Sequence, residues 1–202
     1  MTRRPELLTS NLARIFREAL WYRREFSADQ DHFKMTEIWE RCCRDFVGWT
    51  IKKYMPKETA DYKRKAGVVM LGGRVTLTVD ARLWENAVKG CYLSNFILAH
   101  EFGHLILEHH SGNGVTKNFQ LFEGPSGMSN LPPTLEELEA NFAAVFFQCG
   151  EALKDVDLSH VELARRASSN YRDVAKAQKF VQLETFQKEL FRQTARYQRV
   201  VL

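Results

Sequence analysis

The sequence lacks the features of a membrane protein and of a disulfide-rich secreted domain. Its four cysteines form no C-x-x-C pair, which disfavours a cysteine-based zinc knuckle or a disulfide framework. No apolar run reaches the length of a bilayer span, and the start, MTRRPELLTS, lacks the apolar stretch of a secretory signal. We therefore expect a cytoplasmic protein whose cysteines are buried thiols.

Proline is also scarce, and most of it lies in one segment. Three of the five prolines, Pro125, Pro132 and Pro133, fall within residues 111–133 together with several glycines. Such a segment is not expected to form a long regular element. Two interpretations are open, a lid over a functional site or an ordinary surface insertion.

Long parts of the chain carry apolar residues at helical spacing. This spacing predicts helices over residues 9–24 and 36–55, the second ended by Pro56, and largely helical structure from residue 158 onward. The last part has more lysine and arginine than acidic residues, in a chain of net charge +4. A basic helix can meet nucleic acid or an acidic partner, but a solvated face is the simpler interpretation. We therefore expect no direct binding to nucleic acid and none to a membrane.

Two short β-type runs, residues 68–71 and 74–79, flank Gly72-Gly73, which is the composition of a two-residue hairpin turn. In the second run apolar and polar residues alternate, so one face of that strand should be buried. An exposed edge on the second strand would allow an extended polypeptide to bind by strand addition. Support of the core alone also explains the alternation.

These patterns predict an α+β protein with a short sheet and flanking helices. A chain of 202 residues can form one compact domain with a sizeable core. We expect an N-terminal helical segment over residues 1–56, a core over residues 57–150 and a basic helical extension over residues 151–202, all packed as one unit.

The most informative stretch is His100-Glu-Phe-Gly-His104, inside the apolar run 93–107. Two histidines four positions apart on a helix project from one face and can hold one metal ion, for which zinc is the natural choice. Glu101 then lies beside the metal, where it can take a proton from water. A pair of purely structural histidines is less favoured, because buried imidazoles and a buried carboxylate need a compensating partner.

A catalytic zinc usually has three protein ligands, and the third is expected from the cluster Glu136, Glu137 and Glu139. Glu137 and Glu139 lie roughly 200° apart around a helix, so only one of them can face the metal. We choose Glu137, because Asn141 on the same face can support a ligand by a hydrogen bond. Glu139 remains the alternative, and a capping box with Thr134 is the competing role for Glu137.

The stretches Ile97-Leu-Ala-His100-Glu-Phe-Gly-His104-Leu-Ile-Leu and Glu137-Leu-Glu-Ala-Asn141-Phe-Ala-Ala-Val-Phe together resemble the ImmA/IrrE group of zinc metallopeptidases. The resemblance covers about residues 68–150. It implies a small zincin-like fold with a short sheet packed on the metal helix, zinc held by His100, His104 and Glu137, and Glu101 as the base. It also implies a protein substrate, a DNA-binding repressor or an antitoxin. Val145-Phe-Phe-Gln-Cys-Gly150 departs from the Leu-Met-Pro that is common in the group.

We therefore predict a zinc-dependent metallo-endopeptidase that cleaves or inactivates a specific protein partner. The competing prediction is a zinc-holding interaction module that binds its partner without turnover. Both would use the same ligands, but simple binding gives no chemical reason for Glu101 beside the metal. A further donor should stabilise the oxyanion, and the unranked candidates are Tyr92, His109 and His110.

Overall fold

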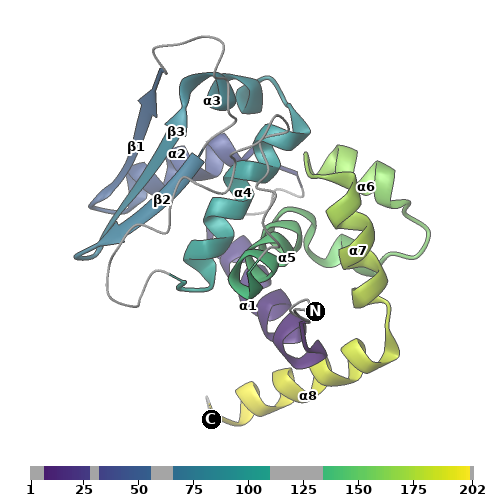
Figure 1. Ribbon diagram of the computed structural model, residues 1–202. Helices are drawn as coiled ribbons and strands as arrows, with labels where there is room; N and C mark the ends of the chain where they lie inside the picture. The colour runs from purple at the N-terminus through teal and green to yellow at the C-terminus, as the bar shows by residue number, and fades with distance from the viewer. Residues whose placement is uncertain (1–6, 28–31, 56–65, 110–133, 201–202) are drawn as a thin grey trace, which may run out of the picture.

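The computed structural model describes residues 7–27, 32–55, 66–109 and 134–200, and over these residues the protein is α+β (Figure 1). The expected class is therefore confirmed, while the predicted 111–133 segment lies outside the described residues. The helices are α1 (Thr9–Ser27), α2 (Met35–Asp45), α3 (Ala81–Val88), α4 (Tyr92–Ile106), α5 (Leu135–Cys149), α6 (His160–Arg166), α7 (Tyr171–Val181) and α8 (Glu184–Val200), with a short 3-10 helix η3 (Gly150–Lys154). The strands are β1 (Trp49–Tyr54), β2 (Ala66–Leu71) and β3 (Arg74–Asp80).

The predicted hairpin is confirmed as β2 and β3, which pair antiparallel. Gly72 and Gly73 join them with φ of +57° and +75°, and positive φ at both positions is what a tight hairpin turn requires of its central residues. The alternation in β3 is confirmed as well, because Val75, Leu77 and Val79 are all buried.

The helix predicted over residues 36–55 is wrong in its second half. Helix α2 ends at Asp45, and β1 begins at Trp49 and runs parallel to β3. Gly48 separates the two elements with φ of +90°, a conformation that ends a helix. Its carbonyl oxygen accepts the N–H of Val75 at 3.1 Å, which starts the pairing. Aromatic and aliphatic residues of β1 fit a helical period by coincidence.

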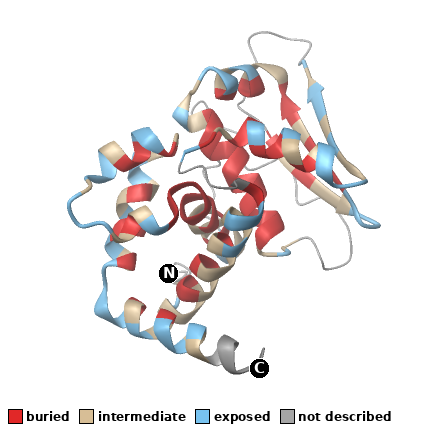
Figure 2. Ribbon diagram, turned by 180° about the vertical axis from the view of Figure 1, so that it is seen from behind, coloured by how far each residue is buried: buried red, intermediate tan, exposed pale blue. Residues whose placement is uncertain are grey.

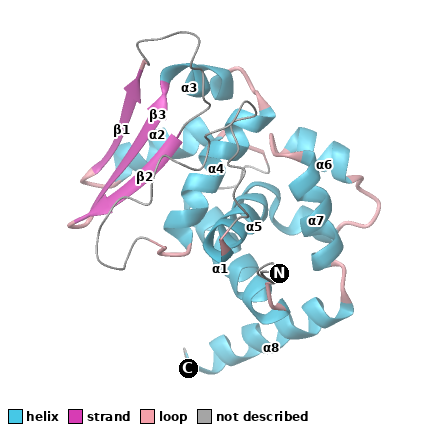
Figure 3. Ribbon diagram, in the orientation of Figure 1, coloured by secondary structure: helices cyan, strands magenta, loops and turns pink. Residues whose placement is uncertain are grey.

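The strand order among the described residues is β1-β3-β2, so β3 is the central strand (Figure 3). The predicted exposed edge at 74–79 is therefore wrong. Both sides of β3 are already paired, and the edges of the sheet are β1 and β2. Of these two, β2 lies against α4. Strand β1 was not predicted from the sequence, and without β1 the strand β3 would lie at the edge of the sheet.

Helix α4 lies at the centre of the molecule, and α5 packs along it (Figures 1 and 2). Every residue of α4 from Ser94 to Ile106 is buried. On one side α4 faces the sheet through β2, and on the other side α5 separates it from α6 and α7. Side chains on α4 are therefore shielded from solvent almost all the way round.

Buried side-chain hydrogen bonds fix α4 in this position. Asn95 accepts the N–H of Met35 through Oδ1 at 3.0 Å and donates through Nδ2 to the carbonyl oxygen of Ala87 at 3.0 Å. Trp39 donates from Nε1 to the carbonyl oxygen of Leu98 at 3.2 Å. These bonds tie α4 to α2 and α3, and they satisfy polar groups that burial would otherwise leave unpaired.

The helix predicted from Thr134 onward is confirmed as α5. Its C-terminal end is held by Arg23 of α1, which donates from Nη1 to the carbonyl oxygens of Phe147 and Gln148 at 2.6 and 2.9 Å. Such a cationic donor satisfies carbonyl groups that have no partner within a helix and complements the negative end of the helix dipole. Gly150, with φ of +57°, then turns the chain into η3.

The largely helical chain after residue 158 is also confirmed, as α6, α7 and α8. Val174, Val181 and Phe186 join a hydrophobic core that extends from α1 through α4 and α5 to α8. Phe191, by contrast, is 77% exposed. The segments 1–56, 57–150 and 151–202 thus share one core, and β1 of the first segment pairs with β3 of the second. Within the described residues, no helix has both the length and the apolar character of a membrane span.

None of the four cysteines forms a disulfide bond, and they fall into two groups by burial. Cys42 and Cys149 are buried as expected, whereas Cys43 and Cys91 are partly exposed. Burial raises the pKa of the Cys42 and Cys149 thiols to about 12. At neutral pH these two side chains are protonated and act as small apolar groups.

Candidate metal centre

Helix α4 brings the two histidines of the HExxH stretch together. His100 and His104 are one turn apart, their rings lie at 90° to each other, and their Nε2 atoms are 3.1 Å apart. Only 5% of His100 and 6% of His104 is exposed. Two imidazole nitrogens at this distance repel each other unless a proton or a cation lies between them.

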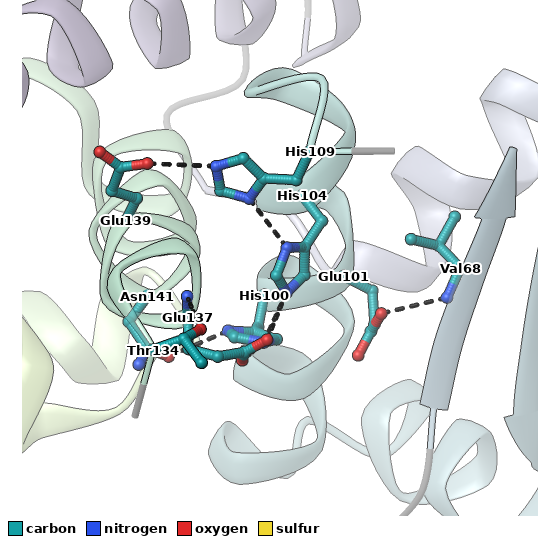
Figure 4. A network of polar contacts seen from close by, with 9 residues as sticks. All are labelled: Val68, His100, Glu101, His104, His109, Thr134, Glu137, Glu139 and Asn141. Carbon is teal, nitrogen blue, oxygen red and sulfur yellow. Dashed lines mark hydrogen bonds and ion pairs between the residues drawn. The ribbon is translucent and has the colours of Figure 1, made fainter. Parts of the chain in front are cut away.

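Helix α5 adds Glu137 to this pair. Its Oε2 lies 3.0 Å from Nε2 of His100, and its Oε1 lies 3.4 Å from Nε2 of His104 (Figure 4). The three side chains form a group that could hold a metal ion. We call His100, His104 and Glu137 the triad.

Gly103 allows α4 and α5 to come close enough to form the triad. A Cβ atom at this position would lie 2.6 Å from the carbonyl oxygen of Ala140 and 3.3 Å from the Cβ of Ala143, both on α5. Real Cβ atoms are not found at the first distance, so a side chain here would push α5 away. The sequence reasoning missed Gly103, although a glycine inside an apolar helix is a known sign of close packing.

Of the two positions that the sequence left open for the Glu137 side chain, the structure shows the one beside the histidines. The backbone N–H of Glu137 donates to Oγ1 of Thr134 at 3.3 Å, which caps the start of α5. Its carboxylate points to the two histidines. Thr134 is therefore a simple N-cap, and the capping box, in which the Glu137 side chain would bond back to the main chain of Thr134, is not formed.

The outer nitrogen of His100 is supported by Asn141, one turn after Glu137 on α5. Nδ1 of His100 lies 3.0 Å from Oδ1 of Asn141. Because an amide oxygen only accepts, Nδ1 carries a proton, which leaves Nε2 as the nitrogen that could bind a metal ion. This is the supporting position that the sequence interpretation gave to Asn141.

The outer nitrogen of His104 meets a different partner, His109, just after α4. The Nδ1 atoms of His104 and His109 are 3.0 Å apart, and Nε2 of His109 lies 3.2 Å from Oε2 of Glu139. Glu139 therefore does not face the triad but reaches it through His109. Of the other candidate oxyanion donors, Tyr92 is 47% exposed at the start of α4 and His110 lies outside the described residues.

Glu101 lies beside the triad and not in it. Its side chain is directed to the sheet, where Oε2 accepts the backbone N–H of Val68 in β2 at 3.1 Å (Figure 4). Burial raises the pKa of Glu101 to about 7, and the nearby charge of Glu137 adds to this increase while that of His100 opposes it. Near neutral pH such a carboxyl group can both accept and release a proton.

The triad itself carries a charge pattern that favours a cation. Burial lowers the pKa of His104 to about 4, so its imidazole is neutral at pH 7. Burial opposes ionisation of Glu137, but hydrogen bonds with both histidines outweigh it and hold its pKa well below the ordinary value. For His100, burial acts to lower the pKa, yet the hydrogen bond and charge of Glu137 raise it. The half-buried negative charge of Glu137 thus attracts a positive partner.

The dimensions of the triad match the coordination shell of zinc. Ligand atoms about 2.0–2.1 Å from a tetrahedral zinc ion lie about 3.4 Å from each other. In the triad the two Nε2 atoms are 3.1 Å apart, Oε2 of Glu137 lies 3.0 Å from His100 and Oε1 of Glu137 lies 3.4 Å from His104; with one atom taken from each residue, the three lie within 4.8 Å of one another. Two imidazole nitrogens and a carboxylate are also donors that zinc prefers. The residues present therefore fit this ion.

No family model matches the sequence, and no curated protein matches it. Membership of the ImmA/IrrE group therefore stays a prediction, and the candidate metal centre is argued from its own geometry.

Proposed function

We propose that this protein is a zinc-dependent metallo-endopeptidase with a zincin-like arrangement of metal helix and sheet. The observation that carries the proposal is the convergence of three potential ligand side chains, two buried and one half-buried, with a fourth ionisable side chain, Glu101, buried next to them. His100, His104 and Glu137 would hold the zinc ion. Three protein ligands leave a coordination position open, as catalytic zinc sites require.

Each residue around the triad has a defined task in peptide hydrolysis. When bound, zinc would act as a Lewis acid. It would polarise a carbonyl group and make water a better nucleophile near neutral pH. Glu101 takes a proton from the attacking water and passes it to the leaving amine. Since the N–H of Val68 holds Oε2 of Glu101, the proton is taken by Oε1. Asn141 keeps His100 in the tautomer that binds metal.

The edge strand β2 supports a polypeptide substrate. It lies against α4, and its residue Val68 already contacts Glu101, so a segment paired with this edge would pass close to the base. Main-chain hydrogen bonds to an edge strand select an extended, flexible stretch of protein. From the resemblance of the two motifs to the ImmA/IrrE group, the substrate we propose is a DNA-binding repressor or an antitoxin.

Glu101 gives the decisive experiment, because it should contact water and not the metal. Glu101→Gln keeps the size of the side chain but removes the base. Wild type and variant, each loaded with zinc, are incubated with a mixed peptide library and with the protein encoded next to this one, and products are identified by mass spectrometry. Zinc content should stay unchanged, while cleavage should fall by about 10²- to 10⁴-fold.

A matched control is Glu40→Gln, which makes the same change at an exposed position of α2 and should cleave as wild type does. A zinc-holding interaction module would give a different result for Glu101→Gln. In that case Glu101→Gln would still bind and inactivate the neighbouring protein, and mass spectrometry would find that protein intact with wild type and variant alike.

A further inference from the structure

The two histidines of the triad receive unequal support. His100 donates to a neutral amide, Asn141, whereas His104 contacts a second imidazole that in turn contacts a carboxylate. Figure 4 shows His104, His109 and Glu139 in a line that leads away from the triad to α5. We call these three residues the relay. Nothing in the HExxH spacing requires His109 or Glu139 to be there.

The turn after α4 places His109 on top of His104. The N–H of His109 donates to the carbonyl oxygen of His104, and the N–H of Glu108 donates to that of Leu105, both at 3.1 Å. This pair of bonds defines a Schellman motif, whose turning position usually needs glycine because φ is positive there. Here that position is Glu108, with φ of +52°. The chain thus adopts an unfavourable conformation and, in doing so, folds His109 back over the metal helix.

The positions of the protons give the hydrogen bonds of the relay a single direction. Nε2 of His104 faces the triad, so when that nitrogen binds metal the remaining proton is on Nδ1. This proton is donated to Nδ1 of His109, which must then carry its own proton on Nε2. That second proton is donated to Oε2 of Glu139. Every donor meets an acceptor only in this arrangement, and it ends on an ionised carboxylate.

Burial makes the arrangement costly to change. The side chains of His109 and Glu139 are 9% and 10% exposed. If either were removed, its partner would lose a hydrogen bond in a place that solvent reaches poorly. A ligand imidazole whose second nitrogen donates toward a carboxylate is held in one orientation and is a stronger donor to the metal.

We propose that His109 and Glu139 are positioning residues of the metal centre, which fix the tautomer and orientation of His104 and thereby set the affinity for zinc. The inference depends on the metal-binding part of the proposed function and not on peptide hydrolysis. It assigns Glu139 a role one step away from the metal.

The test compares Glu139→Gln, His109→Asn and His109→Leu. Glutamine removes only the charge. Asparagine keeps an oxygen near the place of His109 Nδ1, so it still accepts the proton of His104 but loses the link to Glu139. Leucine removes both. Controls with the same chemistry are Glu136→Gln on α5 and His160→Asn at the exposed start of α6.

Two measurements are made on the full chain. Competition with a chelator gives the dissociation constant for zinc, and the visible spectrum of the cobalt-substituted protein reports the ligand field. Glu139→Gln and His109→Asn should weaken zinc binding by about 10- to 100-fold and shift the cobalt bands. His109→Leu should weaken it further, so that asparagine acts as a partial rescue. The two controls should match wild type.

Thermal unfolding of the metal-free variants separates positioning from mere structural support. The inference is overturned if wild type binds zinc while Glu139→Gln and His109→Asn bind it equally well with an unchanged cobalt spectrum. It is also overturned by a second result, in which His109→Asn and His109→Leu lower the zinc affinity by the same factor and this loss is proportional to the loss of Tm in the metal-free variants. Failure of the peptidase proposal would look different, because these affinities would change while Glu101→Gln had no effect on function.

Discussion

Two regions of this protein are rich in ionisable side chains, and they use them in opposite ways. In α6, α7 and α8 acidic residues pair with bases one turn away on the same helix, as Glu162 does with Arg165 at 2.8 Å. These pairs lie at the surface. Between α4 and α5 the partners come from different helices and are largely shielded from solvent, as His100 and Glu137 are, with atoms 3.0 Å apart and side chains 6% and 13% exposed.

The difference shows that burial, and not residue type, distinguishes ionisable side chains that could take part in chemistry from those that only interact with solvent. An exposed pair gains little, because water and salt screen it. A buried group loses its hydration and must be compensated by hydrogen bonds, an opposite charge or a metal. The α4–α5 region carries this cost at five ionisable positions, which is hard to explain by stability alone. Four of these residues are buried, His100, Glu101, His104 and Glu139, and Glu137 is half-buried.

The largest effect should follow from removing the charged ligand. Glu137→Gln should weaken zinc binding by more than the roughly 10- to 100-fold expected for a supporting residue. Glu136→Gln, the neighbouring change on the same helix, should leave affinity as it is. Glu139→Gln should fall between the two, although the sequence alone predicts little effect for it. Chelator competition on all three variants checks this order, and equal affinities for Glu137→Gln and Glu136→Gln would contradict the triad.

A smaller effect should come from the contact that brings the two helices together. In Gly103→Ala the added Cβ meets the carbonyl oxygen of Ala140, a backbone atom that cannot rotate away. Overpacking of this kind costs about 1–3 kcal/mol, and thermal unfolding should show it as a lower Tm. Because α5 must shift, zinc affinity should fall as well. If neither the Tm nor the zinc affinity changed, α4 and α5 would have space between them for the added Cβ, which would contradict this account.

The smallest effect should come from the exposed region. Glu162 accepts from Arg165 and Arg166, and these bonds lower its pKa to about 2. The side chains involved are open to solvent, so the lowered pKa should carry little stability. The Tm of Glu162→Gln should equal that of wild type both at low salt and at high salt. A clear loss of Tm would mean that the surface pairs stabilise the fold, and the contrast with α4–α5 would weaken.

The sequence predicted the parts of this molecule that local chemistry determines. Spacing placed His100 and His104 on one helical face, and the alternation in β3 identified its buried side. Helix geometry allowed only one of Glu137 and Glu139 to face the histidines, Asn141 on the same face favoured Glu137, and the structure places Glu137 there.

What the sequence did not predict depends on contacts between distant segments. Strand β1 was missed because Gly48 was not treated as a break and because its pairing with β3 is parallel and non-local. The relay was missed because Glu108 gives no warning of a turn that normally needs glycine. Gly103 was missed because its role is visible only once Ala140 lies opposite it.

The measurement that tests the central claim most directly is the metal content of the purified protein. Elemental analysis should find about one zinc ion per chain, and the metal-free protein should take up the same amount when zinc is supplied, as a site with three protein ligands requires. Glu137→Gln should take up less under the same conditions. If neither analysis nor titration finds a transition metal bound to the wild-type protein, the triad is only a buried hydrogen-bonded cluster and the zinc centre is wrong.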